Sequence, residues 1–229
     1  MTGKLDAITG VRPLRSQSLD SEVADRIREM ILDGRLAPGV HLVEAELAKA
    51  LCVSQGTVRS GIRALVADGL VEYRQNRGVF VASFTASDAW EVYTLRNALE
   101  ATAAEIAAHR IDDDGRRRLQ QILARMNPAQ KRLSSSALGK LDLELHQTIV
   151  DLSEHKRLSA AYRVLAYQTN LFMTLTGAFP HEQSEVFAQH KKLVDAICGG
   201  HAKRAAELAG SHNTYDGERL VASLTEHMS

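Results

Sequence analysis

The chain has 229 residues, of which 45% are hydrophobic but only 5% aromatic, and it contains four prolines. This length suffices for one large domain or two ordinary ones, and the composition favours helices over a β-sandwich. Basic and acidic residues balance at 28 each, so any nucleic-acid binding must come from local placement of charge rather than from a basic domain.

The two cysteines, Cys52 and Cys198, lie far apart and form no CxxC pair. This spacing argues against a disulfide framework or a zinc ribbon and is typical of a reducing cytosol. No apolar run approaches the length of a membrane span, and the polar N-terminus lacks the apolar segment of a signal peptide. The sequence therefore predicts a soluble, cytoplasmic protein with no membrane partner.

The chain opens with weak periodicity over residues 1–18, which are expected to form a mobile arm. An amphipathic helix is predicted over about 20–33, with Gly34 at its C-cap. A turn and a short strand over 40–42 follow.

The most informative stretch runs from Ala45 to Gly78. Two helices joined by a tight turn are predicted, and Ser54 is a good N-cap for the second, which has an apolar stripe on one face and arginines on the other. A basic-tipped hairpin over 70–74 and 79–83 follows as a wing. This combination fits a DNA major groove. The residues predicted to contact DNA are Ser54, Gln55, Thr57, Arg59, Arg63, Arg74, Asn76, Arg77 and Gly78.

The second half of the chain has a helical pattern throughout, after a linker over 83–87 in which Ser87 or Asp88 is predicted to cap the first helix. The predicted helices are 88–109, 113–126, 137–152, 156–177, 183–198 and 201–226. We therefore expect a mainly α fold. It comprises a winged helix-turn-helix domain over 19–84 and an all-α bundle of six or seven helices over 85–229.

Four residues in the bundle form a candidate metal site. Asp142 and His146 are four apart on one predicted helix, so both project from the same face. His190 and His212 lie on two other predicted helices, in register with apolar residues. One carboxylate and three imidazoles can converge on a divalent ion. On spacing alone, satisfied core histidines are the more frequent alternative, because the chain has nine histidines.

Two sets of motifs carry a family resemblance. In the first 84 residues they are Leu32-Asp-Gly-Arg-Leu-Ala-Pro-Gly39, Glu46-Leu-Ala-Lys-Ala-Leu, Val53-Ser-Gln-Gly-Thr-Val-Arg59, Gly69-Leu-Val and Asn76-Arg-Gly78. In the remainder they are Leu95-Arg96-x-x-Leu99-Glu100, Asp142-Leu-x-Leu-His146 and His190-x-x-Leu-Val-Asp-Ala-Ile197. The first set resembles GntR-type bacterial transcription regulators. The second resembles the FadR-like effector domain called FCD.

The resemblance implies a ligand-responsive, sequence-specific transcription regulator, a repressor rather than an enzyme. A homodimer on a pseudo-palindromic double-stranded DNA operator is the expected assembly. Many FCD domains hold a metal at the positions of Asp142, His146, His190 and His212, so the resemblance implies a divalent ion there. Zinc is expected, with nickel or manganese as alternatives.

An open position on the metal attracts a carboxylate, so a small organic acid is the expected effector. Arg96 is predicted to pair with this anion, and Tyr93 and Asn170 are predicted to line its pocket. An ion pair between Arg96 and Glu100, four residues apart, is the alternative for that arginine. For the whole protein, the alternatives are a direct metal sensor without an organic effector and a metal-dependent hydrolase.

The sequence departs from the family pattern around the second helix of the reading unit. Gln55 stands where an arginine that resembles a guanine reader is usual, and Ala45 replaces a second common arginine. Because glutamine prefers adenine edges, the operator is expected to differ, although drift in a tolerant module is an equal alternative. Further departures weaken helix ends or helix propensity: Val43, Cys52, Gly56 and Gly61.

Overall fold

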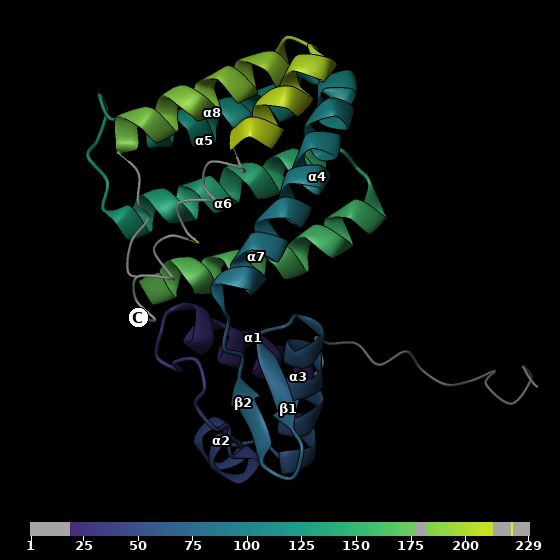
Figure 1. The fold of residues 1–229 in the computed structure, drawn as a ribbon, viewed down its shortest axis with the longest axis vertical. Helices are drawn as coiled ribbons and strands as arrows, with labels where there is room; N and C mark the ends of the chain where they lie inside the picture. The colour runs from purple at the N-terminus through teal and green to yellow at the C-terminus, as the bar shows by residue number, and fades with distance from the viewer. Residues whose placement is uncertain (1–18, 177–181, 213–220, 222–229) are drawn as a thin grey trace, which may run out of the picture.

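The computed structural model describes residues 19–176, 182–212 and 221 (Figure 1). The arm predicted over 1–18 lies outside the described residues. So do residues 213–220 and 222–226 of the helix predicted over 201–226. In chain order the elements are α1 (Leu19–Leu32), α2 (Glu44–Leu51), α3 (Gln55–Ala67), β1 (Val71–Arg74), β2 (Gly78–Val81), α4 (Ala86–Arg110), α5 (Asp113–Met126), α6 (Ser135–Leu152), α7 (Lys156–Thr176) and α8 (Gln183–Cys198). A further helical segment covers 202–212.

The N-terminal elements form a winged helix-turn-helix module, residues 19–81. Its core is made by apolar side chains spaced three or four apart on α1 and α3, such as Ile27, Ile62 and Leu65, none of which is exposed to solvent. β1 and β2 pair antiparallel as the predicted wing. The strand predicted over 40–42 is reduced to a bridge beside β2, where Leu42 N donates to the Val79 carbonyl at 2.8 Å.

The caps of α2 and α3 show the departures noted in the sequence. Val43 is the N-cap of α2 and makes no side-chain cap bond, whereas Ser54 caps α3 by accepting a hydrogen bond from Thr57 N at 3.1 Å. Cys52 ends α2 in the left-handed conformation, with φ of 55°. A residue with a Cβ pays about 1–2 kcal/mol for that conformation, so Cys52 carries strain where glycine would not.

Gly61 has a packing reason that helix propensity alone does not reveal. It lies on the buried face of α3, where an added Cβ would stand 3.0 Å from both the Asp20 carbonyl and Val23 Cγ1 of α1. The missing side chain therefore lets α1 and α3 approach closely. The cost in helix propensity, about 1 kcal/mol, is offset by this contact.

The second half of the chain is the expected helical bundle. Two predicted helices, 88–109 and 137–152, each begin two residues earlier in the structure, as α4 and α6. The cap prediction for α4 was wrong: Thr85 is the N-cap, and Asp88 completes a capping box by accepting from Thr85 N at 2.7 Å. This reciprocal pair satisfies two helix-end donors, which neither Ser87 nor Asp88 as the cap would do.

Helix α4 crosses the bundle and packs against α6, α7 and α8, while α7 runs along its base (Figure 1). The bundle core includes Met126, Leu145 and Tyr162, all fully buried. α1 lies directly beneath α7 and contacts it, so this pair of helices joins the module to the bundle. In the described part of the chain, no helix combines the length and apolar character needed to cross a lipid bilayer.

Candidate functional site

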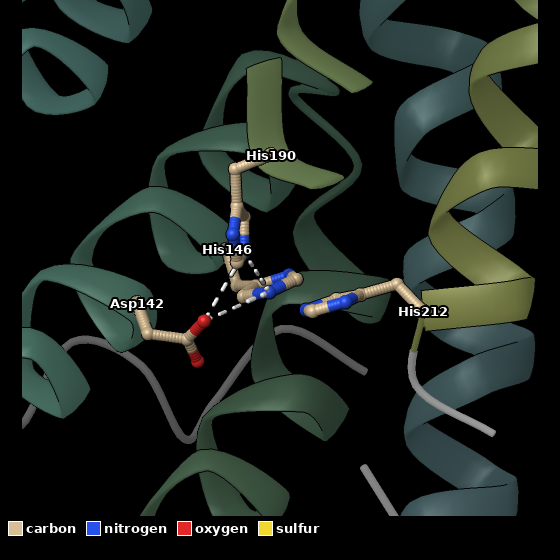
Figure 2. A group of neighbouring side chains, drawn as sticks. All are labelled: Asp142, His146, His190 and His212. Carbon is tan, nitrogen blue, oxygen red and sulfur yellow. Dashed lines mark hydrogen bonds and ion pairs between the residues drawn. The ribbon is translucent and has the colours of Figure 1, made fainter. Parts of the chain in front are cut away.

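The four predicted metal ligands converge inside the bundle (Figure 2). α6 supplies Asp142 and His146, α8 supplies His190, and the 202–212 segment supplies His212. One nitrogen or oxygen atom from each lies within 4.8 Å of the others. His190 Nε2 is 3.1 Å from both His146 Nε2 and Asp142 Oδ1. All except His212 are buried, and His212 is partly buried.

The second ring nitrogen of each histidine has its own partner. Each Nδ1 faces an oxygen that accepts a hydrogen bond, which places the ring hydrogen on Nδ1 and leaves the Nε2 lone pair directed at the shared point. Such outer contacts orient metal-binding imidazoles and make them more basic. The acceptors are Glu100 Oε2 for His146 at 2.7 Å, the Val186 carbonyl for His190 at 2.8 Å and Gln189 Oε1 for His212 at 2.8 Å.

These side chains fit a divalent cation. Asp142 Oδ1 is fully buried and receives no hydrogen bond of good geometry, although His190 Nε2 is close. Two Nε2 lone pairs facing each other at 3.1 Å repel unless a cation or proton lies near both. Burial alone would raise the pKa of Asp142, but the adjacent imidazoles of His146 and His190 hold it below its ordinary value, so a carboxylate faces the three histidines.

Arg96 adopts the alternative arrangement, an ion pair with Glu100. Its side chain is 3% exposed, and its Nη2 and Nε donate to Glu100 Oε1 at 2.7 and 3.0 Å. Burial opposes its charge, yet the neighbouring carboxylate raises the pKa of Arg96 well above the ordinary value. The Tyr93 ring centre lies 5.2 Å from the guanidinium carbon, and Asn170 is partly buried on α7. An effector contact by these three residues stays a prediction.

A cavity of about 190 Å³ lies between α8 and the 202–212 segment, against two of the candidate ligands. The residues that line it are Gln189, His190, Lys192, Leu193, Leu208, Ser211 and His212. None of the three predicted effector residues belongs to this lining, because they lie on α4 and α7. The cavity therefore adds Lys192 as a cationic group near the candidate metal centre.

The predicted DNA-reading surface is the exposed face of α3. Gln55, Arg59 and Arg63 are exposed there, and the Arg59 side chain is 53% exposed. Arg59 donates to Glu44 at the start of α2, with Nη2 at 2.7 Å and Nε at 3.1 Å from Oε2. Those hydrogen bonds lower the pKa of Glu44. Thr57 is half-buried, and its hydroxyl lies 2.8 Å from that of Ser54.

The wing presents its predicted residues at and beside its tip. Asn76 and Gly78 both have positive φ, at 57° and 101°, which the tight turn requires, and Arg77 is exposed between them. Arg74 pairs with Glu72 at 2.7 Å and lies over the Phe80 ring, with 4.4 Å to its centre. The tip is thus open to a ligand, whereas Arg74 is held against its own strand.

Sequence reasoning missed three residues at these two sites. Glu44 was not singled out in the sequence, because its pairing with Arg59 depends on how α2 meets α3. Tyr73, 54% exposed on the wing, follows from the strand alternation. Glu100 was expected to meet Arg96 but not His146, because the second contact crosses from α4 to α6.

Two family models match this chain. The one described as "Bacterial regulatory proteins, gntR family" matches residues 19–81, and the FCD domain matches residues 91–229. The chain belongs to the GntR family of bacterial regulators, with an FCD domain. It is accordingly a DNA-binding transcriptional regulator and not an enzyme. The predicted domain boundary at 84/85 falls between the two matches.

Relatives agree with this assignment, and a solved structure shares the fold. The uncharacterized HTH-type transcriptional regulator YdhC of Bacillus subtilis is 24% identical over 203 residues, covering 88% of this chain and 91% of that protein. LutR from the same organism is 26% identical over 207 residues, covering 81% and 93%. A GntR regulator from Rhodococcus sp. RHA1 has the same fold, with a TM-score of 0.75 and 24% identity over 90% of this chain and 98% of that one.

Proposed function

We propose that this GntR-family regulator is a metal-dependent, ligand-responsive repressor that acts as a homodimer in the cytoplasm. The observation that carries the proposal is the shared geometry of the three histidines. Each has Nδ1 engaged by an acceptor and offers Nε2 to a point that Asp142 also faces. A structural core histidine needs no such convergence.

Asp142, His146, His190 and His212 would hold a divalent ion, with zinc as the first candidate and nickel or manganese as alternatives. The bound ion would supply a Lewis-acidic position for an anionic oxygen. The chain's own residues would do the rest. Acceptors on α4 and α8 hold the imidazoles in place, and the bundle buries Asp142, His146 and His190.

A small carboxylate is the proposed effector class, because an anion complements both an open metal position and nearby cationic side chains. Arg96, which belongs to the FCD pattern, is its first proposed contact, and Tyr93 and Asn170 are proposed from their positions on the helices. Arg96 would then have to bind it while remaining paired with Glu100. Lys192, in the lining of the adjacent cavity, is a second cationic candidate.

Operator binding is proposed to use the exposed face of α3 and the wing tip. Arg59 and Arg63 are both exposed on α3, so this surface is accessible. One relative, from Paenarthrobacter nicotinovorans, is named "Probable D-xylose utilization operon transcriptional repressor" and is 27% identical over 203 residues. That name supports repression as the proposed mode, and a twofold dimer would match a pseudo-palindromic site.

The metal proposal is tested by elemental analysis and zinc titration of the purified chain. Replacing His190 by alanine should reduce bound zinc from about one ion per chain to near zero, since a ligand is removed. His109→Ala, on an exposed position of α4, is the matched control and should keep full zinc content. Full zinc occupancy in the His190 variant would contradict the proposed ligand set.

The effector proposal separates from direct metal sensing by one further measurement. The affinity of the zinc-loaded protein for its promoter DNA is titrated with a panel of small carboxylates and with a chelator. A change with a carboxylate supports the organic effector. A change with the chelator alone would favour the metal sensor.

A further inference from the structure

We infer that helix α7 connects the metal centre to the DNA-binding module, and that Glu100 and Arg96 are positioning residues between them. This inference rests on the metal site proposed above. It assigns the route by which that site acts on the module, through contacts that cross from α6 to α4, from α4 to α7 and from α7 to α1.

The first step is the buried carboxylate of Glu100, whose two oxygens have different partners. Oε2 lies 2.7 Å from Nδ1 of His146, the candidate ligand on α6. Oε1 accepts two hydrogen bonds from Arg96, at 2.7 and 3.0 Å. One carboxylate therefore sets both the orientation of the His146 ring and that of the guanidinium.

The second step leads from Arg96 to α7. Arg96 Nη1 donates to Thr169 Oγ1 at 3.2 Å, and Arg96 Nη2 lies 3.5 Å from the Tyr162 hydroxyl. Thr169 and Tyr162 lie on the same face of α7, so α7 meets α4 at both residues. Thr169 is 1% exposed, and its own hydroxyl hydrogen goes to the Leu165 carbonyl at 2.8 Å. Its oxygen is thus fixed as an acceptor for the arginine.

The third step is the contact between α7 and the module. Leu171 of α7 is buried within the hydrophobic core of the winged module. Tyr167 lies against Arg28 of α1, with 4.8 Å between the guanidinium carbon and the ring centre. Arg28 also pairs with Asp68, the C-cap of α3, at 2.7 Å. The same helix α7 therefore touches the metal-site network and α1, and Arg28 of α1 connects α7 to the end of α3 (Figure 1).

The consequence follows from packing. When His146 is fixed at Nε2, Glu100 and Arg96 are fixed with it, and Thr169 is held against α4. Because α1 contacts α7 and α3 packs on α1, a change in how α7 sits on α4 changes the orientation of the reading surface. Binding at one site then alters affinity at the other through this shared helix.

The test compares full-length wild type with Thr169→Val, Thr169→Ser and Thr148→Val. Valine removes the acceptor oxygen of residue 169 while keeping its shape, and serine restores it. Thr148 is the matched control, because it is also buried and also donates to the carbonyl four residues before it, at 2.7 Å, without an arginine partner. Zinc alone is the probe, added to chelator-treated protein. Calorimetry measures its binding, and hydrogen–deuterium exchange follows amides of α6, α7 and α1.

In wild type, Thr169→Ser and Thr148→Val, zinc should slow exchange in α6, α7 and α1. In Thr169→Val, protection of α6 should persist, while the protection of α1 is lost. Zinc that binds wild type without slowing exchange in α1 would overturn the inference and leave the metal site standing. Equal protection of α1 in Thr169→Val, or its loss in Thr148→Val, would also overturn it. If zinc fails to bind wild type, the proposed function itself fails, and the inference with it.

Discussion

On the predicted DNA-reading surface Arg59 is exposed and pairs with a neighbour on the same small module. At the candidate metal centre, by contrast, the candidate ligands lie inside the bundle, and each histidine is held at its second ring nitrogen. Arg59 can leave Glu44 at little cost, because exposed ion pairs contribute little. The buried groups cannot be changed singly. The exposed face of α3 is therefore suited to exchange an intramolecular partner for DNA. The buried cluster of candidate ligands is suited to keep one fixed geometry.

Replacing Glu100 by alanine should have the largest effect on stability, and it tests whether the buried network around the candidate metal centre is rigid. Its removal leaves the buried guanidinium of Arg96 without its carboxylate, so the free energy of unfolding should fall by about 3–5 kcal/mol. Urea denaturation measures the change. Glu105→Ala, at an exposed position of the same helix, should change it by less than about 0.5 kcal/mol. Equal losses in the two variants would show that the buried pair has no special weight.

Replacing Arg59 by alanine tests whether the exposed face of α3 exchanges its ion pair with Glu44 for a contact with DNA. If the guanidinium leaves Glu44 for a base edge, affinity for the operator should fall by about 1–3 kcal/mol, while stability hardly changes. Fluorescence anisotropy with operator and scrambled DNA measures both affinity and discrimination. Arg117→Ala is the matched control, since this exposed arginine of the bundle also pairs with a carboxylate, that of Asp114. Unchanged operator affinity would remove Arg59 from the reading role.

The smallest expected effect concerns Cys52, in the turn between α2 and α3. Cys52→Gly should raise the free energy of unfolding by about 0.5–1 kcal/mol, because glycine adopts the left-handed conformation without strain. Cys52→Ala keeps a Cβ and should give no such gain. Denaturation of both variants checks this, and a gain shared by alanine would point to the thiol rather than to the backbone.

The fold, including the winged module that carries the proposed reading surface, was largely predictable, because its signals are local. Helix spacing, the Ser54 cap and the basic hairpin tip are all set by residues near one another in the chain. The family match confirms the regulator assignment, and the helical architecture is as expected. The cap of α4 was misplaced by two or three residues, since Thr85 and Asp88 satisfy each other in a way that single-residue preference does not reveal.

The candidate metal centre was less predictable from the residues alone. Asp142 and His146 follow from helix periodicity, but His190 and His212 join them only through the packing of three helices. The resemblance to FCD domains supplied that step. The partners of the ring nitrogens, such as Glu100 and Gln189, depend on side-chain directions across helices that no local pattern encodes.

Gly61 carries a consequence for engineering. An alanine there would suit an isolated helix, yet its methyl group would press on the backbone of Asp20 and push α1 outward by a few tenths of an ångström. Because α1 is also the helix through which the winged module contacts α7, the substitution would change the orientation of the module relative to the bundle. A version of this regulator that is stabilised by placing alanine throughout its helices would therefore present its proposed DNA-reading surface in an altered orientation.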